Sequence, residues 1–228
     1  MKGHEKYKGA LFDMDNTLYN FVDAKIAACD SVVELIGCGD GMELLRYFLQ
    51  KGNGYENHNN IRDYMQDQEV WDEELYKQAC ISYEDVKLNS IRLYPGVEET
   101  LEKLGDSGMK MAVVTDAESS QAEKRLKKTK ISPHFECVIT PNISGNRKPN
   151  PETFLMALEK LKIQTKEAFV IGDSLKRDVE PCNNLGITTI FAKYGDWTGT
   201  PFPSIKPDYI VGNFSEILSI IGHYSDQR

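Results

Sequence analysis

Two aspartates, Asp13 and Asp15, directly follow a short apolar run, Gly9–Phe12. Such a run is typical of a buried strand, and the next residues, Asn16 and Thr17, favour a turn. Two carboxylates held this close repel each other unless a cation or a shared proton compensates their charge. The pair therefore indicates chemistry at the end of a strand, whereas the plainer interpretation is that both residues only cap a turn.

Three later stretches share this form, in which an apolar run delivers a polar group at its end or just beyond. They are Met111–Thr115, Cys137–Thr140 with Lys148 after it, and Ala168–Ile171 with Asp173 after it. The carboxyl ends of parallel strands lie along one edge of a sheet, where ligands bind. A strand order of 3-2-1-4-5 would place the strand that ends at Asp13 between those that carry Thr115 and Asp173.

The elements that must position these groups are a regular alternation of helices and strands after residue 93. The predicted helices are Val97–Gly105, Ser119–Thr129, Pro151–Leu161, Leu175–Leu185 and Ser215–Ile220, and the predicted strands Lys110–Thr115, Cys137–Thr140, Ala168–Ile171, Thr188–Phe191 and Asp208–Val211. This pattern predicts an α/β fold with a doubly wound parallel sheet covered on both faces. Pro181 predicts a kink or a restart inside its helix.

Residues 21–91 have a different character, because their apolar residues recur at helical spacing. Ile26, Cys29, Val33 and Ile36 are one such series, and further helices are predicted over Ile61–Trp71 and Glu73–Ser90. We therefore expect two domains. Residues 1–20 and 92–228 form the α/β core, and residues 21–91 form an inserted helical domain of four helices.

The composition narrows the class of substrate and the compartment. The 228 residues carry a net charge of −8, with no basic stripe for nucleic acid or an anionic membrane. The five cysteines are odd in number and form no Cys-x-x-Cys pair, which argues against a zinc site or a disulfide framework. No signal region or membrane-length apolar segment is present. We expect a cytoplasmic protein that acts on a small molecule; the sequence does not indicate its oligomeric state.

Together, the four stretches resemble in order the four motifs of the haloacid dehalogenase-like hydrolase superfamily. The matching segments are Asp13-Met-Asp15-Asn-Thr17, Val113-Val-Thr115, Lys148-Pro-Asn-Pro and Gly172-Asp173-Ser-Leu-Lys-Arg-Asp178. The resemblance covers residues 7–20 and 93–212. It implies a Rossmann-like core, a magnesium ion and an aspartyl-phosphate intermediate, and it makes residues 21–91 a helical cap of the family's first type.

The residue types fit these catalytic roles. An ionised Asp13 can attack phosphorus and form an acyl phosphate, which splits hydrolysis into two displacements. Asp15 can protonate the leaving alkoxide and then accept a proton from the attacking water. Lys148 offers positive charge and Thr115 a hydroxyl for a phosphate dianion.

Magnesium prefers hard oxygen ligands and keeps part of its water shell. Asp13, the main-chain carbonyl of Asp15 and Asp173 would form a partial ligand shell. Asp178 either binds the ion through water or anchors Lys148.

Asp116 departs from the family's pattern, which commonly has asparagine after the motif threonine. Its carboxylate would repel a phosphate unless it turns toward solvent or toward a cationic group. Two interpretations stay open, an N-terminal helix residue and a substrate-binding residue.

The function expected from the sequence is a magnesium-dependent phosphatase for a small phosphorylated metabolite. A phosphomutase of the same fold would also retain Asp15 and the cap, so it stays open as an alternative. A phospho-accepting regulatory module is less well supported, since such modules are shorter and place the accepting aspartate after a later strand. A dehalogenase has no need of an acid at the position of Asp15.

Overall fold

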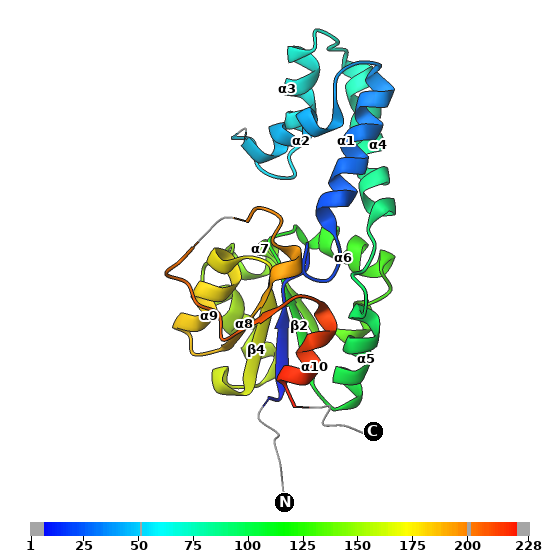
Figure 1. Ribbon diagram of the computed structural model, residues 1–228. Helices are drawn as coiled ribbons and strands as arrows, with labels where there is room; N and C mark the ends of the chain where they lie inside the picture. The colour runs from blue at the N-terminus through cyan, green and yellow to red at the C-terminus, as the bar shows by residue number, and fades with distance from the viewer. Residues whose placement is uncertain (1–6, 51, 200–201, 223–228) are drawn as a thin grey trace, which may run out of the picture. The chain divides into compact units, whose positions relative to one another are not determined.

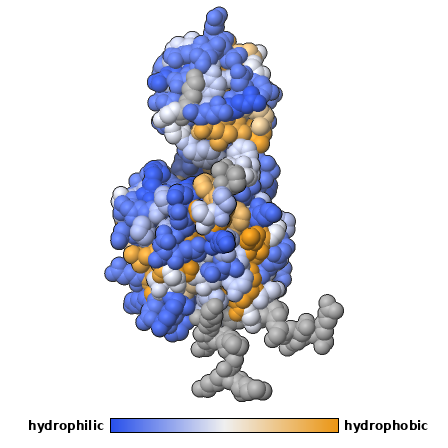
Figure 2. Space-filling model, turned by 60° about the vertical axis from the view of Figure 1, so that its left-hand side comes forward, coloured by the Kyte–Doolittle hydropathy of each residue, from blue (hydrophilic) through white to orange (hydrophobic). Residues whose placement is uncertain are grey.

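The computed structural model describes residues 7–50, 52–199 and 202–222 of the chain. It divides into two compact units, one formed by Met1–Asn20 with Arg92–Arg228 and the other by Phe21–Ile91. We call the first the core unit and the second the helical unit (Figure 1). On the face drawn in Figure 2, hydrophilic side chains cover most of each unit, and each unit also shows smaller hydrophobic areas.

The core unit is built on a parallel sheet, which among the described residues has six strands in the order β3-β2-β1-β4-β5-β6. The strands are β1 Gly9–Phe12, β2 Lys110–Val114, β3 Cys137–Ile139, β4 Ala168–Gly172, β5 Thr188–Ala192 and β6 Tyr209–Val211. The predicted α/β class and doubly wound order are confirmed. Strand β1 lies between β2 and β4. Along the chain, the strands after β1 are added first on its β2 side and then on its β4 side, so the strand order reverses at β1, next to Asp13.

Helices cover both faces of this sheet. In Figure 1, α8 (Glu152–Leu161) and α9 (Glu180–Asn184) lie on one side, and α5 (Val97–Asp106) and α10 (Ile217–Ile220) lie on the other. Leu11 packs in a cluster with Phe154 and Leu158 of α8. Its neighbour Phe12 contacts the ring of Phe214, with the ring centroids 6.0 Å apart. Successive strand residues point to opposite faces, so a fully apolar strand is needed where both faces are buried.

The described loops and short helices differ from the prediction near the sheet edge. Leu175–Leu185 is not one α-helix: a π-helical turn, η3 (Leu175–Val179), precedes α9. Pro181 lies in the first turn of α9, where its missing N–H costs no hydrogen bond. The expected restart therefore occurs at Glu180. Two short helices, α6 (Ser119–Lys128) and α7 (Pro141–Ser144), follow β2 and β3, and α7 was not predicted.

The helical unit contains α1 (Phe21–Ile36), α2 (Gly41–Gln50), α3 (Asn59–Asp67) and α4 (Glu73–Ser90). Helix α3 begins and ends earlier than predicted, and Asp72 caps α4 by accepting a hydrogen bond from the Leu75 N–H at 2.8 Å. The core of the helical unit includes the stacked rings of Phe48 and Tyr83, whose centroids are 4.9 Å apart.

An ionic cluster around the buried Lys87 links the last helix of this unit to the loop before α3. The ammonium of Lys87, 2% exposed, lies 2.7 Å from Glu84 and 3.3 Å from Glu56. The His58 ring nitrogen Nε2 lies 2.8 Å from the same Glu84 oxygen. Burial alone would raise the pKa of Glu84, but the hydrogen bond with His58 and the charge of Lys87 outweigh it and lower the pKa to about 2.

We expect Glu84→Gln to destabilise the protein at pH 7 by about 1–2 kcal/mol after allowance for solvent screening. Because the folded pKa is lowered, the contribution of the carboxylate is complete above the unfolded value near 4.5 and is lost as the pH falls toward 2. Urea unfolding at pH 7 and pH 3 should show a gap between wild type and variant that shrinks in acid. Glu73→Gln, which removes an exposed carboxylate 3.6 Å from Lys77, is the control and should change little. A gap that does not depend on pH would contradict this assignment.

Candidate active site

Asp13 lies where β1 meets its neighbours, with its N–H donating to the Ile171 carbonyl of β4 at 2.9 Å. The Lys148 ammonium donates to Asp13 Oδ1 at 2.5 Å and to Asp178 Oδ1 at 2.6 Å. The Thr17 hydroxyl donates to the other oxygen of Asp13 at 2.9 Å. Two donors, Lys148 and Thr17, therefore fix the two oxygens of the Asp13 carboxylate.

These contacts lie in a nearly dry environment. Lys148 and Asp13 are each 5% exposed and Asp178 is fully buried. Burial by itself would lower the pKa of the Lys148 ammonium. The negative charges of Asp13 and Asp178 together have the larger effect, and they raise this pKa. Lys148 is therefore a fixed positive charge at neutral pH.

Asp173 completes an acidic cluster with Asp13 and Asp178, and one possible ligand atom from each lies within 4.8 Å of the others. Asp173 Oδ1 is buried and accepts no hydrogen bond in the described part of the chain; the Arg177 guanidinium is 3.9 Å away. Burial and the charges of Asp13 and Asp178 raise the pKa of Asp173 well above its usual value. A buried carboxylate oxygen with no donor, beside two other hard oxygen ligands, fits a magnesium ion.

Two glycines allow the strand ends to approach this closely. A Cβ atom at Gly172 would lie 2.4 Å from the Cγ of Asp178, and one at Gly195 would lie 1.8 Å from the main-chain oxygen of Asn16. The π-helical turn η3 and the loop after β5 therefore need glycine at these contacts. Asn16 has a φ of 62°, a left-handed conformation that asparagine tolerates.

Thr115 follows β2 and is buried, with its N–H donating to the Ile139 carbonyl at 3.0 Å. Its hydroxyl oxygen accepts the N–H of Ala117 at 3.1 Å, so the hydroxyl proton points elsewhere and can be donated to a ligand.

Asp15 is held by groups that the sequence did not identify. Arg125 Nη1 lies 2.8 Å from Asp15 Oδ2 and 3.1 Å from Oδ1, and the Tyr19 hydroxyl donates to Oδ1 at 2.7 Å. Arg125 is 1% exposed, although it lies on a helix rich in charged residues. A signal was present: Ala122, Arg125 and Leu126 fall at helical spacing on one buried face of α6. An arginine on a buried face indicates a specific acidic partner.

Asp116 contacts the motif that contains Lys148. Its Oδ1 accepts the main-chain N–H of Lys148 at 2.9 Å, and its Oδ2 lies 3.4 Å from Arg177 Nη1. The Arg147 guanidinium donates to the Asp116 carbonyl at 2.6 Å. The carboxylate is therefore turned toward a main-chain N–H and the Arg177 guanidinium of the chain itself, which offsets its repulsion of a phosphate.

We expect Asp116→Asn to change kcat/KM for p-nitrophenyl phosphate by less than about threefold, because the amide oxygen still accepts the Lys148 N–H. Asp116→Ala removes that acceptor and should lower kcat/KM by about 10- to 100-fold, because Lys148 is no longer held in place. Glu118→Gln removes a neighbouring exposed carboxylate, which pairs with Arg147 at 2.6 Å, and serves as the matched control. Equal losses in the alanine and asparagine variants would refute this role.

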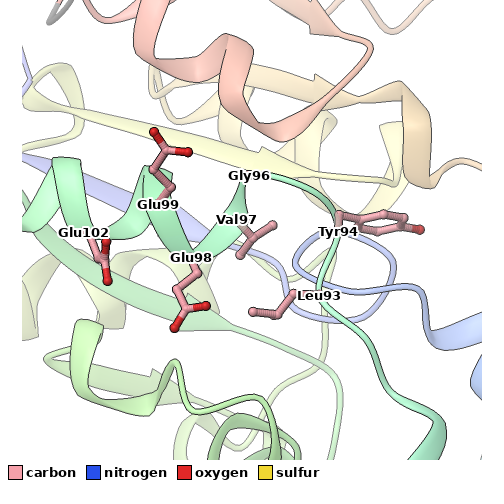
Figure 3. Close-up of a pocket in the computed structure, with 7 residues that line it drawn as sticks. All are labelled: Leu93, Tyr94, Gly96, Val97, Glu98, Glu99 and Glu102. Carbon is pink, nitrogen blue, oxygen red and sulfur yellow. The ribbon is translucent and has the colours of Figure 1, made fainter.

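A separate pocket lies at the start of α5, lined by Leu93, Tyr94, Gly96, Val97, Glu98, Glu99 and Glu102 (Figure 3). Its three glutamates project from one helix, and none of the residues around Lys148 lines it. Three carboxylates on one side of a pocket repel a phosphate, so the site at the strand ends is the better candidate for phosphate binding.

The expected cytoplasmic location stays a prediction. Among the described residues, no helix has the length and apolar character needed to cross a membrane. The five cysteines are free thiols.

Comparisons with known proteins place the chain among proteins of similar sequence and fold. A glyceraldehyde 3-phosphate phosphatase of Methanocaldococcus jannaschii is 29% identical over 227 residues, which cover 94% of this chain and 96% of the relative. The crystal structure of a predicted phosphoglycolate phosphatase from Haemophilus somnus is similar at a TM-score of 0.75 and 27% identity, over 96% of this chain and 99% of that one.

A candidate β-phosphoglucomutase of Thermotoga maritima shares the fold at a TM-score of 0.79 and 22% identity, over 96% of this chain and 100% of that one. The family model of haloacid dehalogenase-like hydrolases matches residues 10–192, a range that includes Asp13, Asp15, Thr115, Lys148, Asp173 and Asp178. The chain therefore belongs to the haloacid dehalogenase-like hydrolase family.

Proposed function

We propose that this phosphatase of the haloacid dehalogenase-like family hydrolyses a small phosphate monoester with the help of Mg²⁺, through an aspartyl-phosphate on Asp13. The observation that carries the proposal is the hydrogen bonding of Asp13. Its two oxygens accept from Lys148 and Thr17, which fix the carboxylate at the edge where β1 and β4 end. A nucleophile held in one orientation loses little entropy when it attacks.

Asp13 attacks the phosphorus atom and forms the acyl phosphate. Lys148 and the Thr115 hydroxyl stabilise the negative charge on the transferring phosphoryl oxygens, and they act in a site that excludes most water. Asp13 and Asp173, with the Asp15 carbonyl, would hold Mg²⁺, which neutralises the phosphoryl oxygens when bound. Asp178 holds Lys148 at 2.6 Å and accepts the Ser174 N–H at 3.1 Å, so it anchors the cation.

Asp15 protonates the leaving alkoxide and then accepts a proton from the water that attacks the phosphoenzyme. Its side chain is 22% exposed, whereas its partner Arg125 is buried. The partial exposure supports this role, because the carboxyl group must reach the leaving oxygen and later the water.

Residues 21–91 serve as the cap that selects the substrate. The chain leaves the core unit after Asn20 and returns at Arg92, and the Asn20 N–H donates to the Arg92 carbonyl at 3.3 Å. The Tyr94 N–H donates to the Leu18 carbonyl at 3.0 Å. The two segments that connect the units are thus hydrogen-bonded to each other where they leave the core unit, and the first of them follows Asp15 within a few residues. Short connecting segments of this kind are typical of a hinge.

The substrate is a small phosphorylated metabolite rather than a nucleic acid, as the net charge of −8 also favours. The relatives named glyceraldehyde 3-phosphate phosphatase and phosphoglycolate phosphatase support this class. A panel of phosphorylated metabolites, assayed for inorganic phosphate and for isomerised ester, tests the proposal. Isomerised product without phosphate release would favour the phosphomutase alternative.

Asp13→Asn should abolish phosphate release, since the amide removes the nucleophile and keeps its volume. Residual activity is expected at least about 10³-fold below wild type. Circular dichroism measured on the same sample checks the fold, and trapping of the phosphoenzyme in acid should give labelled wild type and unlabelled variant. Appreciable turnover by a folded Asp13→Asn protein would exclude the covalent mechanism.

Removal of divalent cations with a chelator should abolish turnover, and added Mg²⁺ should restore it, because three buried carboxylates beside a phosphate need a compensating charge. Asp173→Asn should raise the Mg²⁺ concentration needed for half-maximal activity. Ca²⁺ should bind but support little turnover, since its larger and looser shell misplaces the nucleophile. Full activity in excess chelator is the result that would disprove a magnesium requirement.

A further inference from the structure

Arg125 is an unusual residue for its place in the fold. It lies in α6, a helix that carries Arg125, Lys127 and Lys128 in its last turn, yet its side chain is 1% exposed. Transfer of a guanidinium from water into a protein interior is costly unless strong hydrogen bonds compensate the loss of hydration. In this case the Asp15 carboxylate, 110 residues earlier in the chain, supplies such bonds.

Tyr19 is a second hydrogen-bond donor to the same carboxylate. Its hydroxyl donates to Asp15 Oδ1 at 2.7 Å, and its side chain is fully buried. Arg125 Nη1 bridges both oxygens at 2.8 and 3.1 Å, which leaves the carboxylate little freedom to rotate.

These partners differ from those of Asp13, whose oxygens accept from Lys148 and Thr17. The two aspartates of the motif are thus separated into two hydrogen-bonding environments, one for the nucleophile and one for the acid/base. A rate that depends on proton transfer is sensitive to the position of the carboxyl group, and a shift of about 1 Å costs as much as about 100-fold.

We infer that Arg125 and Tyr19 form an orienting clamp, which fixes the Asp15 carboxyl group in the direction needed for proton transfer to the leaving group. Both are positioning residues, because they act through Asp15. This inference rests on the proposed function. The alternative is that Arg125 and Asp15 form an ion pair that only stabilises the core unit.

The two interpretations predict different dependence on the leaving group. Phenol, with a pKa of about 10 like that of tyrosine, needs protonation as it leaves, whereas p-nitrophenol is a much better leaving group. The ratio of kcat/KM for p-nitrophenyl phosphate to that for phenyl phosphate therefore reports proton transfer by Asp15. It is insensitive to later steps, because kcat/KM covers only the steps up to departure of the leaving group.

The experiment measures this ratio for wild type, Arg125→Met, Arg125→Lys and Tyr19→Phe. We expect Arg125→Met to lower kcat/KM for phenyl phosphate by about 10- to 100-fold and that for p-nitrophenyl phosphate by less than about threefold. Arg125→Lys keeps the charge and should recover part of the loss. Lys127→Met removes an exposed charge from the same helix, where Lys127 pairs with the exposed Glu123 at 2.6 Å, and is the matched control.

A double-variant test shows whether the effect passes through Asp15. In an Asp15→Asn background, Arg125→Met should leave the ratio unchanged, because a positioning residue has nothing left to position. Tyr19→Phe removes one hydroxyl and keeps the ring, so it carries the same test if Arg125→Met does not fold.

Equal losses for both esters, or a further change of the ratio in the Asp15→Asn background, would overturn the clamp. A wild-type protein that releases phosphate from neither ester and from no member of the metabolite panel would instead overturn the proposed function, so the two failures are distinguishable.

Discussion

The ammonium of Lys148 lies between two carboxylates, Asp13 and Asp178, and the site depends on this contact. All three groups are buried, and burying any one of these charges without its partners would cost much free energy. Lys148 draws the end of β1 toward the π-helical turn that carries Asp178, and the Asp116 carboxylate fixes the main chain of Lys148 itself. A buried cation of this kind specifies one arrangement of three loops, because any other leaves an uncompensated charge.

The parallel sheet makes this arrangement possible. Strands β2, β1 and β4 are neighbours, so Thr115, Asp13 and Asp173 all emerge from the same edge. Close contact between the loops then requires small residues, and Gly172 and Gly195 lie where a Cβ atom would collide with Asp178 or with the main chain of Asn16. The geometry of the sheet and the absence of two side chains bring the carboxylates into reach of one another.

Charge is then distributed pairwise across the site. Asp13 and Asp178 share Lys148, Asp15 has Arg125, and Asp116 has Arg177. Asp173 is held least closely, since its Oδ1 accepts no hydrogen bond in the described part of the chain and lies 3.9 Å from the Arg177 guanidinium. The oxygen that lacks a donor is thus in the group best placed to hold a divalent cation. This separation allows adjacent carboxylates to take different roles in one site.

The sequence alone determined the strands and the residues at their ends, because apolar runs and turn-forming residues act locally. The strand order around β1 was an expectation, which the structure confirms. Gly9–Phe12 is a strand with the predicted bounds, and the helix and strand alternation after residue 93 predicted the parallel sheet. Only the tertiary structure decided the partners. Arg125 meets Asp15 across 110 residues and Asp116 meets the Lys148 N–H across 32. No local pattern encodes such pairs, since each depends on how two separate loops pack at the sheet edge. The π-helical turn that carries Asp178 was missed for the same reason: the local sequence favours an α-helix, and contact with Lys148 and Gly172 fixes the turn.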